Sequence, residues 1–171
     1  MTSPRHPPSL LARARPALAA VPLALLAAAD ASAVTVSPAG DLVAAGTLSY
    51  RKGIASLSCA TTFTGTISAE GAVNISAASF GSSGLCSHIS AVGLPWSGQA
   101  QPSGVLVIDN AAVHVSAPFV GGQCGPSRIE LQWDNAKSTL GFKDVLLVAA
   151  SGSSCKTNGL ISVTPALDVQ P

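Results

Sequence analysis

Four cysteines are the residues of this chain whose type and spacing could carry chemistry. Cys59 and Cys86 are the closest two in the sequence, and Cys124 and Cys155 follow further along. Zinc and similar ions are held by close pairs such as Cys-x-x-Cys, because neighbouring ligands lower the ordering cost of the site. No such pair occurs in this sequence. The spacing therefore predicts two disulfides and no metal site.

Groups that could act in catalysis are few. His88 and His114 are the only histidines after residue 33. His114 lies between Val113 and Val115 in an alternating run, so we expect it on the opposite face from these valines. His88 follows Cys86 by two positions, but a cysteine held in a disulfide is no nucleophile. The sequence has no G-x-S-x-G turn, no nucleotide-binding glycine motif and no calcium loop, and no carboxylates suggest a facing pair. We expect a protein that is not an enzyme and uses no cofactor.

The first 33 residues have the pattern of an export signal. A stretch with three arginines precedes the apolar run PALAAVPLALLAAA at 16–29, and small residues at 31 and 33 form a cleavage site. The run is shorter than the roughly 20 apolar residues that span a bilayer. We expect cleavage after Ala33 and a single mature domain of residues 34–171. Its expected location is the periplasm, the cell surface or the medium, with no transmembrane segment once the signal is removed.

The charge of the predicted mature chain is close to neutral. Six basic and seven acidic side chains follow Ala33, and they are scattered along the sequence. Because no basic stripe is present, we expect no binding to nucleic acid. The even number of cysteines fits the oxidising compartment that an exported chain enters.

Alternation of apolar with polar or hydroxylated residues predicts β-strands over most of residues 34–171. It is clearest at 55–67 and in RIELQWD, residues 128–134. Shorter runs occur at 42–50, 72–77, 105–109, 113–115, 139–142, 145–148 and 160–163. Turn residues lie between runs at 69–71, 109–110, 134–138 and 156–159, and we expect 97–104 to form a longer central connection.

About nine strands without an amphipathic helix predict an all-β domain. We expect an antiparallel β-sandwich of the Ig-like or Greek-key type. A closed β-barrel is the alternative, because alternation alone does not separate the two architectures.

The order of elements around the cysteines favours one disulfide pairing. Cys59 opens a strand, turn and strand that end in the loop GSSGLC at Cys86, and Cys124 opens a similar series that ends in SGSSC at Cys155. This order favours Cys59–Cys86 and Cys124–Cys155, each closing a hairpin. The other two connectivities stay open, since sequence alone does not decide among the three.

Two segments suggest an apolar surface. Trp96 follows a proline in GLPWSG, where its ring either caps the core or faces a ligand. DVLLVAA, residues 144–150, abandons alternation, so this strand is either central in the fold or leaves apolar side chains exposed. The candidate apolar surface comprises Trp96, Val145, Leu146, Leu147 and Val148.

An ordered set of motifs resembles a known family. The motifs are SLSCATTFTGTI, ASFGSSGLCSHISAVGLPW, CGP at 124–126 followed by LQWDNA, and CKTNGLISVTPAL. In these motifs, which cover nearly all of the mature chain, the sequence resembles the bacterial protein activators of alkane oxidation. The resemblance implies a secreted, non-enzymatic accessory that promotes growth on long-chain hydrocarbons and brings no catalytic residues. Its expected partners are hydrocarbons or an oil–water interface.

A pilus or adhesin subunit at the cell surface is the alternative function. Such subunits are also exported, disulfide-bonded and rich in strands. Assembly by strand donation requires an N-terminal extension of alternating apolar residues. The segment VTVSPAG, residues 34–40, alternates only as far as Pro38, which argues mildly against this alternative. The sequence leaves the oligomeric state open.

Overall fold

Antiparallel strands dominate residues 33–118 and 120–171, the part of the chain that the structure, a computed structural model, describes. All but the last residue of the predicted export signal, residues 1–33, lie outside the described residues. The strands are β1 (Thr35–Ser37), β2 (Gly40–Lys52), β3 (Ala55–Ile67), β4 (Ala72–Ser79), β5 (Ile89–Ala91), β6 (Trp96–Ala100), β7 (Val105–Val115), β8 (Gly122–Asp134), β9 (Thr139–Leu147), β10 (Cys155–Thr164) and β11 (Asp168–Gln170). A short 3-10 helix, η1 (Gly84–His88), lies between β4 and β5. Within the described residues, no helix has the length and apolar character needed to span a membrane.

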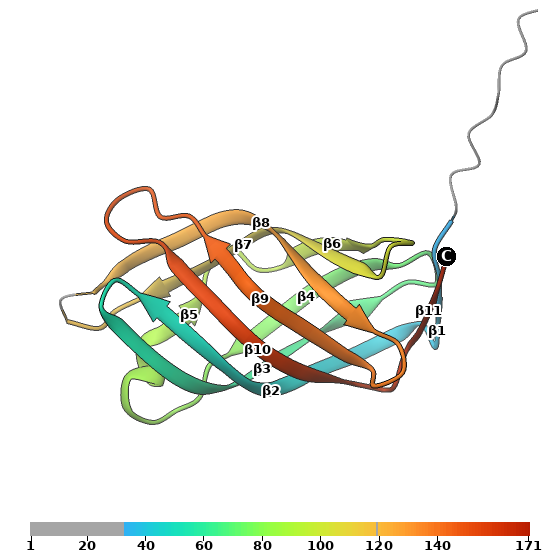
Figure 1. The fold of residues 1–171 in the computed structure, drawn as a ribbon, viewed down its shortest axis with the longest axis horizontal. Helices are drawn as coiled ribbons and strands as arrows, with labels where there is room; N and C mark the ends of the chain where they lie inside the picture. Colours follow the sequence, from blue (N-terminus) through green and yellow to red (C-terminus); the bar gives the residue numbers. More distant parts are fainter. Residues whose placement is uncertain (1–32, 119) are drawn as a thin grey trace, which may run out of the picture. The chain divides into compact units, whose positions relative to one another are not determined.

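The main sheet closes into a barrel (Figure 1). Its strands follow one another in the order β2, β3, β4, β6, β7, β8, β9 and β10, and β10 pairs back with β2. β5 and β6 lie along the same edge of β7, with β6 on Leu106–Ile108 and β5 on Val113–Val115. Together they fill one position in the barrel wall. A closed barrel pairs the two edge strands that an open sheet would leave exposed.

The expected β-sandwich is therefore wrong, and the alternative of a closed barrel is correct. Both architectures put one apolar face of each strand inside, so both produce the same alternation in sequence. What distinguishes the barrel is the pairing of β7 with β8 and of β2 with β10. These pairings join segments whose own residue patterns do not specify a partner.

Two expected turns are irregularities inside strands. Asn110, with a φ of 58°, lies within β7 where the register against β8 shifts between Ile108 and Ala111. Residues 156–159 lie within β10, where the register against β9 also shifts. There the side-chain oxygen of Asn158 accepts a hydrogen bond of 2.7 Å from the backbone N–H of Asp144. Such bulges bend a strand without ending it, which suits the curvature of a barrel wall. The expected connection at 97–104 is also partly strand, because β6 occupies its first four residues.

The barrel interior is apolar. Arg128, Glu130 and Gln132 of β8 point outward while Leu131 is buried, which is the alternation expected for 128–134. Aromatic rings meet in the interior: Phe63 stacks on Phe142 at 6.3 Å between centroids and lies 6.2 Å from Trp96. The inward rows of the wall strands thus form one continuous core.

The two ends of the barrel are closed in different ways (Figure 1). At one end a two-stranded ribbon of β1 and β11 pairs through Val36 and Val169. The N–H of Val36 also donates to the carbonyl of Ala69, in the turn between β3 and β4, at 2.8 Å. At the other end lie η1 and the loops that precede β3, β8 and β10. The four cysteines lie in η1 and in these three strands. We refer to the two ends as the ribbon end and the disulfide end.

Candidate functional site

An internal cavity of about 70 Å³ lies at the ribbon end of the barrel. Every position of the barrel wall contributes to its lining, through Ala44, Phe63, Ile75, Trp96, Ile108, Leu131, Phe142 and Ile161 among others. Gln101 and Gly104, in the connection between β6 and β7, are the exceptions to an otherwise apolar set of lining residues. Ionisable side chains are absent from the lining among the described residues. The cavity therefore offers dispersion contacts to a ligand and no acid–base chemistry.

Both tryptophans of the chain line this cavity, and their polar atoms are bonded elsewhere. The indole N–H of Trp96 donates to the carbonyl of Val92 at 2.9 Å. The indole N–H of Trp133 donates to the side-chain oxygen of Asn135 at 2.7 Å. Buried indoles normally keep such a partner. The rings consequently present carbon to the cavity.

The ribbon covers this end of the barrel through a side-chain clasp at Asn135. The Asn135 amide accepts a hydrogen bond from the N–H of Val169 at 2.8 Å and donates one to the Val169 carbonyl at 2.9 Å. Leu167, just before β11, and Val169, within it, contribute to the lining of the cavity. The clasp thus holds the C-terminal strand against the hairpin of β8 and β9.

The disulfide end contains a smaller cavity of about 30 Å³. It is lined by side chains that include Tyr50, Leu57, Leu85 and Val115. Burial raises the pKa of the Tyr50 phenol, while its 2.8 Å hydrogen bond with Thr61 acts in the opposite direction. The phenol therefore stays neutral well into the alkaline range.

The cysteines form the two bonds that the order of elements favours. Cys59 of β3 joins Cys86 of η1, with an S–S distance of 2.04 Å. Cys124 of β8 joins Cys155 of β10, with an S–S distance of 2.01 Å. The glycine–serine loops 81–85 and 151–154 lead into the second cysteine of each pair, so these loops serve the cross-links at the disulfide end.

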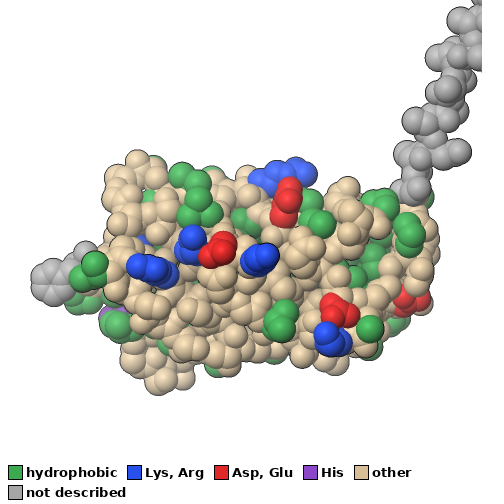
Figure 2. Space-filling model, in the orientation of Figure 1, with side chains coloured by type: hydrophobic (Ala, Val, Ile, Leu, Met, Phe, Trp, Pro, Cys, Tyr) green, Lys and Arg blue, Asp and Glu red, His purple; other side chains and the backbone are tan. Residues whose placement is uncertain are grey.

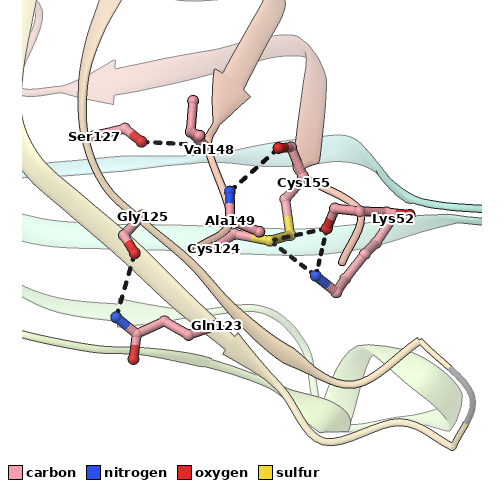
Figure 3. The surroundings of a disulfide bond; sticks show 10 residues. Lys52, Gln123, Cys124, Gly125, Ser127, Val148, Ala149 and Cys155 are labelled. Carbon is pink, nitrogen blue, oxygen red and sulfur yellow. Dashed lines mark hydrogen bonds between the residues drawn. A yellow bond between two sulfur atoms is a disulfide. The ribbon is translucent and has the colours of Figure 1, made fainter. Parts of the chain in front are cut away.

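A buried lysine lies beside the second disulfide, as Figure 3 shows. Lys52 is only 6% exposed, and its Nζ donates to the carbonyl of Ser153 at 2.6 Å. The same Nζ lies 3.3 Å from Cys124 Sγ. Lys52 ends the inward row of β2, where the alternation of the strand turns a charged side chain toward the interior. The residue pattern gives no signal for this contact, because Lys52 and Cys124 are 72 positions apart in the chain.

The two histidines lie in different elements, His114 on β7 and His88 at the end of η1. His114 is exposed on β7 between the buried Val113 and Val115, as its neighbours predict. His88 ends η1, and its Nδ1 lies 3.2 Å from the hydroxyl of Ser116. Cys86 is held in its disulfide. Among the described residues, no three His, Cys, Asp or Glu side chains are grouped so that they could hold a metal ion.

The candidate apolar surface is wrong in three of its five residues. Trp96, Val145 and Leu147 are buried in the barrel interior, with exposed fractions of 5–7%. Leu146 and Val148 are exposed on the outside. This strand does alternate between interior and surface, but it looks uniform in sequence because its outward positions are also apolar.

Other exposed apolar side chains lie in a turn, in η1 and at an outward position of β10. Ile54, in the turn between β2 and β3, is 97% exposed, and Leu85 of η1 and Leu160 of β10 are exposed by half or more. Figure 2 shows apolar side chains scattered over a surface that is mostly uncharged. Its charges include three opposite pairs, Arg128–Asp109, Lys137–Asp134 and Lys156–Asp144, at 3.1–3.4 Å.

Two exposed carboxylates are held by local contacts. The side-chain hydrogen bond from Lys137 is the main cause that lowers the pKa of Asp134, and a bond with Ser68 is the main cause that lowers the pKa of Glu70. Both contacts lie in turns at the ribbon end. They stabilise the turns to which the ribbon is attached.

Comparison with known proteins identifies one family. The model of the family described as alkane oxidation protein activator PraA/PraB-like matches residues 11–171. Neither the curated proteins nor the solved structures contain a match to the chain.

Proposed function

The chain belongs to the alkane oxidation protein activator PraA/PraB-like family, and we propose that it is an exported, non-enzymatic accessory that promotes the use of hydrocarbons. The observation that carries the proposal is the family match over nearly the whole chain. The expected export signal would place the folded domain outside the inner membrane, where it meets hydrocarbon before the cell takes it up.

A physical mechanism follows from the disulfide end of the barrel. Ile54, Leu85 and Val148 are exposed apolar side chains in three connections at this end, with exposed fractions of 97%, 50% and 57%. Moving such side chains from water into oil is favourable by about 25 cal/mol per Å² of apolar surface. The near-neutral charge of the domain adds little electrostatic opposition to adsorption. We propose that this end inserts into an oil–water interface.

The disulfides suit a protein that works at an interface. Leu85 lies next to Cys86, and Val148 lies in the loop that leads to Cys155. A cross-link limits how far a loop can unfold. We refer to the side chains of Ile54, Leu85 and Val148 as the apolar tips. These tips would therefore enter oil while the barrel keeps its fold.

The test compares two triple variants of the exported protein. The tip variant carries Ile54→Ser, Leu85→Ser and Val148→Ser. The matched wall variant carries Val43→Ser, Leu146→Ser and Leu160→Ser, which remove exposed apolar side chains from strands instead of tips. We expect purified wild-type protein to lower the interfacial tension between hexadecane and water, the tip variant to lose most of this effect, and the wall variant to retain most of it.

Growth of a producing strain on hexadecane is the second measurement. We expect deletion of the gene to slow this growth, and complementation with wild type but not with the tip variant to restore it. Unchanged growth after deletion would overturn the accessory role. A ladder of detergent-resistant oligomers would instead favour the surface-subunit alternative.

A further inference from the structure

We propose that the 70 Å³ cavity at the ribbon end is a binding site for a saturated alkyl chain, either a short alkane or the terminal carbons of a longer one. This deepens the proposed function by naming a ligand class and a site, and it rests on that function only for its biological meaning. The site lies at the opposite end of the barrel from the apolar tips.

The size of the cavity fits a few carbon atoms. A single water molecule needs roughly 10–15 Å³ of such space, whereas an apolar cavity of about 150 Å³ takes up a benzene molecule. The interior of an eight-stranded barrel is either filled by side chains or holds one small ligand. At about 70 Å³ the cavity lies between these cases, so it has room for a few carbons of a chain and is about half the size of the cavity that takes up benzene.

The chemistry of the lining excludes polar ligands. The indole N–H groups of Trp96 and Trp133 are bonded to Val92 and Asn135, so neither is free to bind a ligand. Within the part of the chain that the structure describes, Gln101 is the one other lining residue with a polar side chain, and it lies in the connection between β6 and β7. Among the apolar wall residues a water molecule, hydroxyl or carboxylate would lose its hydrogen bonds to solvent without replacement, which costs several kcal/mol in an apolar medium. A saturated chain incurs no such penalty and gains about 0.8 kcal/mol for each CH₂ group removed from water.

Small residues create the space. Ala44 of β2 is 2% exposed and pairs across the sheet with Phe63 of β3, and Ala100 ends β6. Both line the cavity beside the larger Leu, Ile and aromatic side chains that fill the rest of the interior. A leucine at position 44 would extend three additional carbons toward the cavity.

The route into the site passes the ribbon. β11 pairs with β1 over three residues, and the Asn135 clasp holds its Val169. Leu167 and Val169 line the cavity from this side. Displacing this short strand would open the cavity to solvent without breaking a pairing between wall strands.

Binding can be measured with the chain's own fluorescence, because its two tryptophans both line the cavity. The exported wild-type protein is titrated with n-hexane, and with 1,6-hexanediol as a polar chain of the same carbon number. We expect a saturable change in tryptophan emission and a higher thermal unfolding temperature with n-hexane, and neither with the diol.

Cavity-filling variants locate the site. Ala44→Leu is expected to weaken n-hexane binding about tenfold, since it displaces roughly two CH₂ groups of ligand. Val163→Leu, which adds one carbon to another lining residue, is expected to weaken it by a smaller factor of about fourfold. The matched control is Val115→Leu, which adds the same carbon at the 30 Å³ cavity of the disulfide end and should leave n-hexane affinity unchanged.

Two outcomes would overturn the site. One is the lack of any saturable response to n-hexane in folded wild-type protein. The other is wild-type affinity in folded Ala44→Leu protein, or in Val163→Leu protein if Ala44→Leu does not fold. The tip variant separates the two proposals, because it should bind n-hexane normally while losing interfacial activity. Normal n-hexane binding with no growth effect after gene deletion would count against the accessory role alone.

Discussion

Lys52 Nζ lies 3.3 Å from Cys124 Sγ and donates a hydrogen bond to the carbonyl of Ser153, so a buried ammonium group adjoins the Cys124–Cys155 disulfide. A nearby positive charge stabilises a thiolate. When a reductant attacks Cys155, Cys124 departs as the thiolate, and Lys52 is placed to stabilise that leaving group. The second disulfide therefore has an electrostatic partner within its immediate surroundings.

Lys52→Met should slow the reduction of Cys124–Cys155 by dithiothreitol about threefold, because the leaving thiolate loses its neighbouring charge. Timed alkylation followed by peptide mass spectrometry measures each bond separately. Cys59–Cys86 serves as an internal reference and should react at the same rate in both proteins. Lys137→Met, at an exposed lysine, is the matched control. Equal rates for Cys124–Cys155 in wild type and Lys52→Met would contradict the role of this ammonium group.

Tyr50 should make stability fall in alkaline solution. Its pKa is raised in the folded state by burial, whereas the unfolded phenol titrates near 10. The contribution of Tyr50 to the free energy of unfolding is therefore fully present below about pH 10. It is lost as the pH rises toward the folded pKa, because only the unfolded chain releases the phenol proton in that window. Since Tyr50 is the chain's one tyrosine, absorbance at alkaline pH reports its ionisation directly.

Tyr50→Phe tests this prediction. At neutral pH it should cost about 1 kcal/mol of unfolding free energy through loss of the hydrogen bond with Thr61. Above about pH 10 its stability should decline less steeply than that of wild type. Denaturant unfolding across this range provides the measurement, and parallel curves for the two proteins would refute the assignment.

Asn135→Ala should release β11. The substitution removes the side-chain partner of the Trp133 indole and both bonds to the Val169 backbone. Because these groups are partly solvated, we expect a loss of about 2 kcal/mol, less than the sum for three buried hydrogen bonds. Hydrogen exchange at the Val169 amide should accelerate well beyond the global effect. Asn74→Ala, at an exposed position on β4, is the control, and unaltered exchange at Val169 would disprove the clasp.

Export should leave a mature chain that begins at Val34. Val34 is buried, and β1 begins at Thr35, so cleavage after Ala33 would remove no residue of the barrel or its ribbon. N-terminal sequencing of the protein from the periplasm or medium checks the site. Ala33→Leu should block cleavage, since the peptidase requires a small residue there. A mature terminus within β1 would contradict the prediction.

The alternation of apolar and polar residues predicted many of the strands that form the barrel wall. The run 55–67 is β3 with the same bounds, and the order of cysteines around two hairpins favoured the pairing that is observed. Turns at 69–71 and 134–138 also lie where their residues indicate. The prediction of turns at 109–110 and 156–159 was wrong, because these residues lie within β7 and β10. Asparagine and glycine occur in bulges as readily as in turns.

The sequence by itself determined which side chains alternate, where most strands lie and how the cysteines are ordered, because these depend on residues close together in the chain. The tertiary structure alone decided that the sheet closes. Closure depends on pairings such as Lys52 with Cys155 and Val43 with Thr164, which no local period encodes. It also decided that Trp96 and Trp133 line one apolar cavity. Alternation turns each of these side chains inward, but only the curvature of the closed barrel sets which inward side chains meet and where space remains between them.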